Sequence, residues 1–174
     1  HNPTGRVWTK EEIKKLGDIC IKHNVIVFSD EIHSDFTYSG YKHHMFTSID
    51  DKYKENTIIA LAPSKTFNIA GLQASYAIIE NENLRYLFSN ELNSFGFHTL
   101  NMLGQVASYA CYKHGEEWLK ELKEYLQGNL EYLECEFSNL KKIKMIKPQG
   151  TYLVWLDMSE LGLKDELYDK VKNV

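Results

Sequence analysis

Three residues whose side chains could do chemistry recur at similar intervals in the first half of the chain. Asn2 precedes a Pro-Thr-Gly turn, Asp30 follows one apolar run, and Lys65 follows another. The intervals of 28 and 35 residues are close to the roughly 30 residues of a strand-helix-strand unit. Because such units can return the chain to the same edge of a parallel sheet, we expect the three side chains to converge there.

An amine, a carboxylate and an amide at one site are what pyridoxal phosphate (PLP) chemistry requires. The amine forms a Schiff base with the cofactor's aldehyde, and the carboxylate keeps the ring nitrogen protonated so that the ring can take up electrons. Each residue also has a simpler interpretation: Lys65 as a solvated lysine, Asp30 as a helix cap, and Asn2 as a turn former. If the chain has no PLP site, all three simpler interpretations must hold at once.

The segments around these residues alternate between helix and strand patterns. Thr9 and Glu12 have capping-box spacing at the start of a helix that ends near His23. Apolar runs predict three strands, of which the first two should be buried in a parallel sheet: 25–28, 57–61 and 75–79. The connection 36–56 should be long and irregular, as functional loops often are. The expected fold class is therefore α/β.

The second half of the chain is predicted to be mostly helical. A helical pattern from residue 83 to Gly115 is interrupted near 94–96, and a long amphipathic helix follows. The last segments are a hairpin-like pair and a helix, at 143–146, 151–156 and 165–174. A length of 174 residues allows one full core or parts of two domains. We predict two, with residues 1–115 in a sheet domain and residues 116–174 in a linking helix and a smaller α/β domain.

Composition excludes several functions. A net charge of -4 and a pI near 6.0 do not suit nucleic-acid binding. No apolar run approaches the roughly 20 residues of a membrane span, and no signal-peptide pattern opens the chain. Three widely spaced cysteines favour reduced core thiols in a cytoplasmic protein: Cys20, Cys111 and Cys135. The adjacent His43 and His44 suit a surface or a substrate loop better than a metal site.

Three motifs resemble a known family. They are His-Asn-Pro-Thr-Gly-Arg-Val-Trp at 1–8, Ser-Asp-Glu-Ile-His-Ser-Asp-Phe at 29–36, and Ala-Pro-Ser-Lys-Thr-Phe-Asn at 62–68. In this order they resemble the class I/II aminotransferase superfamily, the fold type I PLP enzymes, and more narrowly its cystathionine β-lyase-like (C-S lyase) branch. Pro-Gln-Gly-Thr-Tyr at 148–152 extends the resemblance to the end of the chain. It implies part of a large domain, with a mostly parallel sheet and helices on both faces, and part of a smaller C-terminal domain.

The resemblance implies roles for Lys65, Asp30 and Asn2. Lys65 would bind PLP as a Schiff base and, once displaced by an amino acid, remove the substrate's α-proton. Asp30 would pair with the pyridinium nitrogen. Asn2 would donate to the phenolic oxygen of the cofactor and lie near the substrate carboxylate.

Further residues follow from the same motifs, with two departures. Ile32 would press against one face of the ring, and Ser64 would contact the phosphate. His33 stands where many aminotransferases have a tyrosine, and it too can bond the phenolic oxygen. Gln73 stands where many have a phosphate-binding arginine, which leaves the phosphate contacts open.

The implied activity is a PLP-dependent C-S β-lyase that releases pyruvate, ammonia and a thiol from cystathionine or cysteine S-conjugates. An aminotransferase is the alternative, and a non-catalytic regulatory or interaction protein on the same fold is a second one. The resemblance also implies an amino-acid substrate and a homodimer. Because the chain begins at His1 in a turn motif, we expect a piece of a longer polypeptide, which would associate or dissolve poorly on its own. A processed mature chain is the alternative.

Overall fold

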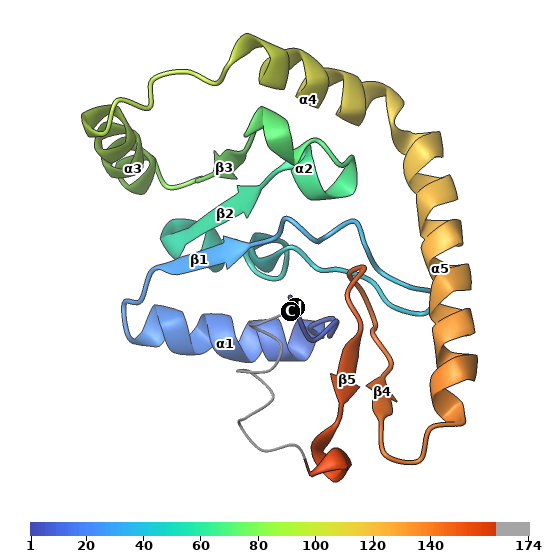
Figure 1. The fold of residues 1–174 in the computed structure, drawn as a ribbon. Helices are drawn as coiled ribbons and strands as arrows, with labels where there is room; N and C mark the ends of the chain where they lie inside the picture. The colour runs from blue at the N-terminus through green and yellow to red at the C-terminus, as the bar shows by residue number, and fades with distance from the viewer. Residues whose placement is uncertain (163–174) are drawn as a thin grey trace.

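The computed structural model describes residues 1–162 of the 174-residue chain, so the helix expected at 165–174 lies outside the described residues. Five helices and five strands make up the main framework of the described part (Figure 1). The helices are α1 (Lys10–Lys22), α2 (Pro63–Thr66), α3 (Glu82–Ser94), α4 (Met102–His114) and α5 (Glu116–Ser138). The strands are β1 (Val27–Asp30), β2 (Thr57–Leu61), β3 (Tyr76–Ile78), β4 (Lys144–Ile146) and β5 (Trp155–Asp157). Four short 3-10 helices connect them: η1 (Phe46–Ser48), η2 (Asp51–Asn56), η3 (Ala70–Leu72) and η4 (Ser159–Leu161).

The main sheet has three strands in the order β1-β2-β3 and is mixed. β1 and β2 are parallel, with Val27 opposite Thr57, whereas β2 and β3 are antiparallel, with Ile59 opposite Ile78. The α/β class is confirmed, but the expected mostly parallel sheet is correct for only one of the two strand pairs. The link from β2 to β3 contains only the four-residue α2 and the three-residue η3, which fall short of a usual parallel crossover helix.

The first strand differs from its prediction in position and burial. It covers Val27–Asp30 rather than 25–28, and Val25, Ile26 and Phe28 are 48%, 57% and 61% exposed. β1 pairs with β2 alone among the described strands, so burial on both faces is wrong for it. β2 lies between two neighbours and is buried as predicted, with Ile59 fully enclosed.

The core lies between α1 and the segment that follows β1. Buried Ile13, Phe46 and Tyr53 form it, with half-buried Ile21, Val27 and Ile49 packed around them. The Tyr53 hydroxyl donates to the carbonyl of Lys14 at 3.0 Å and to Asp18 at 2.7 Å. The connection predicted as irregular therefore contains η1 and η2 and supplies two of the three core residues.

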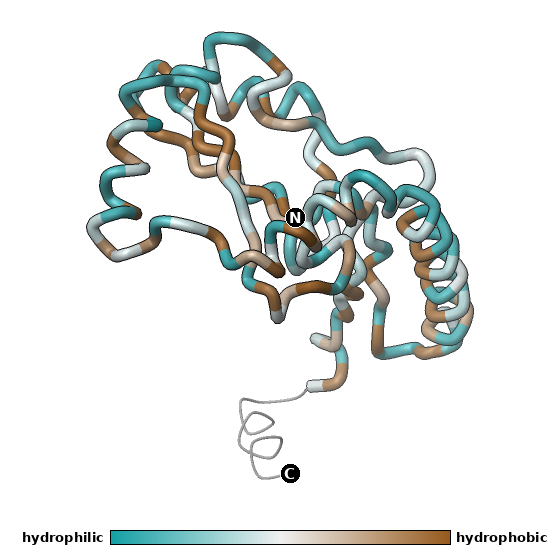
Figure 2. The backbone as a smooth tube through the Cα atoms, turned by 90° about the horizontal axis from the view of Figure 1, so that it is seen from above, coloured by the Kyte–Doolittle hydropathy of each residue, from teal (hydrophilic) through white to brown (hydrophobic). Residues whose placement is uncertain are grey.

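The remaining helices lie outside this core. α4 crosses beyond β3, and α5 stands beside the sheet and leads to the hairpin of β4 and β5 (Figure 1). Hydrophobic and hydrophilic residues alternate along α5 (Figure 2), where Leu130 is the one buried residue. The predicted hairpin-like pairing of segments 143–146 and 151–156 is confirmed, with Met145 opposite Leu156.

The three cysteines are free thiols and all lie in helices. Cys20 and Cys111 are half-buried, whereas Cys135 is exposed. The expectation of core thiols is therefore wrong for Cys135, which occupies the outward face of α5.

Candidate active site

A cleft of about 250 Å³ lies where the N-terminal turn meets the carboxyl end of β1. It brings together three of the predicted site residues, Asn2, Asp30 and His33. The other lining residues come from the N-terminal segment, the loop after β1 and the β4-β5 hairpin: His1, Arg6, Val7, Trp8, Glu31, Ser34, Phe36, Thr37, His43, Gly150 and Thr151. Ile32, Ser64 and Lys65 are not among them.

His33 contacts two residues from distant parts of the chain. The Asn2 amide nitrogen lies 3.4 Å from its Nε2, and the Tyr152 ring packs against it with 5.4 Å between centroids. Burial lowers the pKa of His33 from its ordinary value, the Lys65 ammonium lowers it further, and the Asp30 carboxylate opposes the shift. The charges of Lys65 and Asp30 therefore act on the pKa of His33 in opposite directions.

The other ring nitrogen of His33 has no partner. Among the described residues, its Nδ1 is the one buried side-chain nitrogen or oxygen without a hydrogen bond. Because the Asn2 amide nitrogen donates to Nε2, a neutral imidazole carries its proton on Nδ1. A buried N–H without an acceptor is rare in folded proteins, and a ligand oxygen would satisfy it.

Asp30 lies at the carboxyl end of β1, where the sequence places it. Its carboxylate accepts a hydrogen bond from the backbone nitrogen of Ile32 at 3.2 Å, and Ile32 itself is half-buried. The local turn contact matches part of the simpler capping interpretation, although no helix follows. Asp30 also lines the cleft, so its carboxylate is available to a ligand there.

Lys65 lies in α2, one short helix beyond β2. Pro63 occupies the first turn of this helix, where its fixed φ and missing N–H are tolerated. Thr66 donates to the Asp35 carboxylate at 2.8 Å, which ties α2 to the loop after β1. Ser64 and Lys65 are half-buried on the same helix. Lys65 therefore lies on a helical turn that is held against the cleft-forming loop.

The hairpin tip completes the cleft by joining two distant segments. The backbone nitrogens of Gln149 and Gly150 both donate to the carbonyl of Gly5, at 2.7 and 2.9 Å. The Gln149 side chain accepts from the Val7 nitrogen at 2.8 Å, and Thr151 donates through its backbone to Phe36 at 2.8 Å. The Pro-Gln-Gly-Thr-Tyr motif therefore lies against the cleft.

Two glycines are required for this approach. A Cβ on Gly5, whose φ is +71°, would lie 2.5 Å from the Cβ of Pro148. A Cβ on Gly150 would lie 2.5 Å from the carbonyl oxygen of Phe36. Neither distance is compatible with a side chain unless the backbone moves, so both motifs need glycine here.

Glu31 is a second carboxylate at the site, and it has no role in the sequence-based assignment. It is 4% exposed and accepts from Ser29 Oγ at 3.0 Å, from the Phe46 backbone nitrogen at 2.9 Å and from His43 Nε2 at 2.6 Å. His43 is half-buried on the cleft wall rather than on the open surface. Residues 1–162 contain no group of three or more side chains suited to hold a metal ion.

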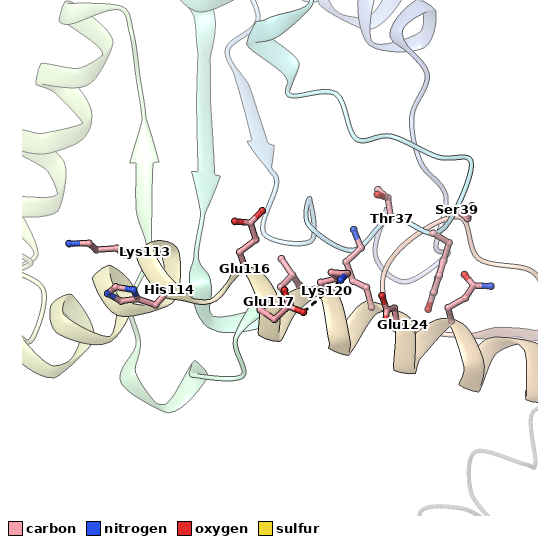
Figure 3. Close-up of a pocket in the computed structure, with 12 residues that line it drawn as sticks. Thr37, Ser39, Lys113, His114, Glu116, Glu117, Lys120 and Glu124 are labelled. Atoms are coloured by element: carbon pink, nitrogen blue, oxygen red, sulfur yellow. Dashed lines mark ion pairs between the residues drawn. The ribbon is translucent and has the colours of Figure 1, made fainter.

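A larger groove of about 780 Å³ lies along the first turns of α5 (Figure 3). Residues 37–39 form one side of it, and the end of α4 with α5 forms the other. Its charged side chains have both signs, and Lys120 pairs with Glu117 at 3.7 Å. It contains none of the predicted site residues, so its size does not make it the candidate active site.

Comparison with known proteins agrees with the motifs. A family described as aminotransferase class I and II matches residues 1–173. The chain belongs to this family. Cystathionine β-lyase PatB of Bacillus subtilis is 46% identical over 166 residues, covering 95% of this chain and 43% of that protein. An aspartate aminotransferase of the same species is 28% identical over 168 residues, covering 94% of this chain and 42% of that protein.

Solved structures give the same picture. The crystal structure of cystalysin from Treponema denticola, which contains a pyridoxal 5'-phosphate cofactor, superimposes with a TM-score of 0.93 at 37% identity. The match covers 98% of this chain and 43% of that one. The predicted family and its lyase branch are thus confirmed, and the chain spans less than half the length of these relatives. No described helix is both long and apolar enough to cross a membrane.

Sequence reasoning missed three contributors to the site: Glu31, His43 as its partner, and Tyr152. Glu31 lies inside the 29–36 motif, directly after the last residue of β1, and a second carboxylate beside Asp30 was the available signal. The contact between Tyr152 and His33 joins residues more than 100 positions apart, and no local pattern predicts it.

Proposed function

We propose that the protein is a PLP-dependent C-S β-lyase that acts on cystathionine or other S-substituted cysteines. The observation that carries the proposal is the set of groups around the end of β1. Asn2, Asp30 and His33 line one cleft, and Lys65 is near enough for its charge to lower the pKa of His33. The greater identity to PatB than to the aspartate aminotransferase favours a lyase over a transaminase.

The residues present fit PLP. His33 has a buried Nδ1–H that lacks an acceptor, and the phenolic oxygen of the cofactor would supply one. Asp30 offers a carboxylate for the pyridinium nitrogen, Lys65 a primary amine for the aldehyde, and Ser64 a hydroxyl for the phosphate. Ile32 is the apolar side chain two residues after Asp30 and would pack on the ring. These roles, and the homodimer that the family implies, are part of the proposal.

When bound, PLP supplies an electron sink that stabilises negative charge at the substrate's α-carbon. The chain's own residues handle the proton and orient the reacting groups. Lys65 takes the α-proton, after which the bond between Cβ and sulfur breaks and the thiolate leaves with the bonding pair. Asp30 keeps the pyridinium nitrogen protonated, and Asn2 and His33 fix the phenolic oxygen. With one water, cystathionine gives homocysteine, pyruvate and ammonia.

The test is an absorbance spectrum of the full protein with added PLP, before and after borohydride, followed by peptide mapping and a pyruvate assay. We expect a visible band, covalent label on the peptide that contains Lys65, and pyruvate from L-cystathionine. Lys65→Ala should lose the label and the pyruvate, while Lys113→Ala, on α4, should keep both. A labelled enzyme that forms no pyruvate contradicts the lyase assignment.

An aminotransferase is the second candidate, favoured by the match to the aspartate aminotransferase over 94% of the chain. It uses the same residues but returns a keto acid that retains the side chain and needs an acceptor keto acid. Product analysis by mass spectrometry, with and without 2-oxoglutarate, separates the two. Label scattered over surface lysines would instead support a non-catalytic protein on this fold.

A further inference from the structure

Lys65 lies on a helix that is too short to hold its own orientation. α2 has only four residues, whereas isolated helices shorter than roughly 12–15 residues are already marginal in water. The direction of the Lys65 side chain is therefore set by the contacts that α2 makes with the rest of the chain. The next two residues, Thr66 and Phe67, make such contacts with two separate segments.

Thr66 joins α2 to the loop after β1. Its side chain is 1% exposed, and its hydroxyl donates to Asp35 Oδ2 at 2.8 Å. In the sequence Asp35 stands between Ser34 and Phe36, which both line the cleft, whereas Asp35 does not. A hydrogen bond to an ionised carboxylate is stronger than one between neutral groups. Asp35 therefore fixes α2 relative to the wall of the cleft.

The loop that carries Asp35 is itself held in place. The Phe36 side chain is 4% exposed, and its carbonyl accepts a hydrogen bond from the Thr151 backbone nitrogen at 2.8 Å. The Phe36 ring also meets the Tyr152 ring edge to face, with 5.2 Å between centroids. Asp35 thus offers Thr66 an acceptor at a defined position.

Phe67 joins α2 to the junction between α4 and α5. Its ring meets the Tyr112 ring edge to face, with 6.0 Å between centroids, and lies 5.7 Å from the Trp118 ring. Gly115, between the two helices, leaves room for the Phe67 ring, because a Cβ there would overlap it. α2 is therefore held at a second point, by aromatic contacts of favourable geometry.

We propose that Asp35, acting through Thr66, and Phe67 are positioning residues that aim the Lys65 amine at the cofactor's aldehyde and at the substrate's α-proton. The inference rests on the proposed function, which gives Lys65 these two tasks. Asp35, Thr66 and Phe67 are absent from the cleft lining, so they act on the reaction through α2. A displacement of about 1 Å at a reacting group can cost about 100-fold in rate.

The first experiment removes the Thr66 hydroxyl and keeps the shape of the side chain. In the PLP-loaded full protein, Thr66→Val should lower kcat per bound PLP for L-cystathionine about 10-fold to 100-fold. KM should change less than about 3-fold, because no substrate contact is lost. Thr66→Ser keeps the donor and should restore most of kcat. Thr57→Val is the matched control, since Thr57 is also 1% exposed and lies at the start of β2.

The second experiment follows the cofactor instead of the turnover. Cofactor-free full protein is mixed with saturating PLP, and the visible band and the borohydride-trapped label on the Lys65 peptide are followed in time. Thr66→Val and Asp35→Ala should each slow both signals about 10-fold or more. The double variant should be no slower than the slower single variant, because the two residues share one hydrogen bond. Thr57→Val should keep the unsubstituted rate.

The third experiment tests the contact of Phe67. Phe67→Leu keeps an apolar side chain but removes both ring contacts, so kcat per bound PLP and the labelling rate should fall together, by about 3-fold to 10-fold. Phe88→Leu is the matched control, because Phe88 is half-buried on α3. A loss in Phe67→Leu no larger than in Phe88→Leu overturns the role of Phe67.

The outcomes separate this inference from the proposed function. Unchanged kcat and labelling rate in Thr66→Val, or equal losses in Thr66→Val and Thr57→Val, overturn the role of Asp35 and leave the lyase in place. A protein that is labelled at Lys65 but forms no pyruvate overturns the lyase, and the labelling rates still decide the positioning roles. Absence of label on Lys65 overturns both. If Thr66→Val does not fold, Asp35→Ala decides by the same measurements.

Discussion

α1 and α3 are helices of equal length that differ in packing. We call α1 with η1 and η2 the packed layer, and α3 with the residues beside it the exposed layer. Each helix has 13 residues and a side-chain N-cap, Thr9 in α1 and Asn81 in α3. α1 buries Ile13 and Gly17 against η1 and η2, whereas α3 has no buried residue. Local signals thus start both helices equally well, but of the two only α1 buries residues against the rest of the described chain. The stability of the two layers should differ accordingly.

The largest effect should come from removing the ring at the centre of the packed layer. Tyr53 is 0% exposed, and Tyr53→Ala should lower the free energy of unfolding by about 3–5 kcal/mol, because it leaves a cavity and two unmade hydrogen bonds. Phe95→Ala, at the end of α3 and 71% exposed, should cost less than about 0.5 kcal/mol. Urea unfolding followed by circular dichroism measures both, and equal costs would contradict the contrast.

A smaller effect is expected where the hairpin tip crosses the N-terminal turn. Gly150→Ala brings a Cβ within 2.5 Å of the Phe36 carbonyl oxygen, so we expect a loss of about 1–3 kcal/mol as the backbone shifts. Gly96→Ala is the control beside α3, where φ is +80° and no atom lies within 4 Å. It retains only the cost of the left-handed conformation, about 1 kcal/mol. Thermal unfolding of both variants distinguishes close packing from backbone strain.

The sequence predicted the features that depend on local pattern and missed those that depend on contacts between distant residues. The capping box at Thr9, the buried strand at 57–61 and α5 follow from local pattern, and all three are confirmed. β1 was shifted, because hydrophobicity at Val25 and Ile26 does not show whether a neighbour covers them. Tyr53 was missed for the opposite reason, since its neighbours come from α1, more than 30 positions away.

The candidate site also combines features predicted from local motifs with features that depend on long-range contacts. Asn2, Asp30 and His33 were predicted from motifs, and the cleft brings them together, whereas their chemical roles stay predictions. The domain boundary at 115/116 also stays a prediction. It coincides with Gly115 between α4 and α5, yet the tip of the β4-β5 hairpin packs on residues 5–7 and 36–38. Only long-range contacts could show that this segment forms part of the cleft.

Helix caps should show equal effects in the two layers. Thr9 accepts from the Glu12 nitrogen at 3.2 Å, and Asn81 accepts from the Leu84 nitrogen at 2.9 Å. Thr9→Ala and Asn81→Ala should each reduce helix stability by about 1 kcal/mol, because each frees one backbone donor. Hydrogen exchange of the first turns measures both locally. Global unfolding should register the loss in α1 more strongly, because α1 is packed into the core.

The smallest effect concerns pH and distinguishes the packed layer by its charges. Lys52, the Tyr53 hydroxyl and Lys14 hold the pKa of Asp18 well below its ordinary value of 3.8. Because the folded pKa is lowered, the stabilisation is complete above that ordinary value and is lost as pH falls below it. The difference in unfolding free energy between the unsubstituted chain and Asp18→Asn should therefore shrink between pH 5 and pH 2. Added salt should shrink it at pH 5 as well, because both lysines are half exposed and their charges are screened. A difference that persists at pH 2 would assign the role of Asp18 to its hydrogen bond with Tyr53 instead of its charge.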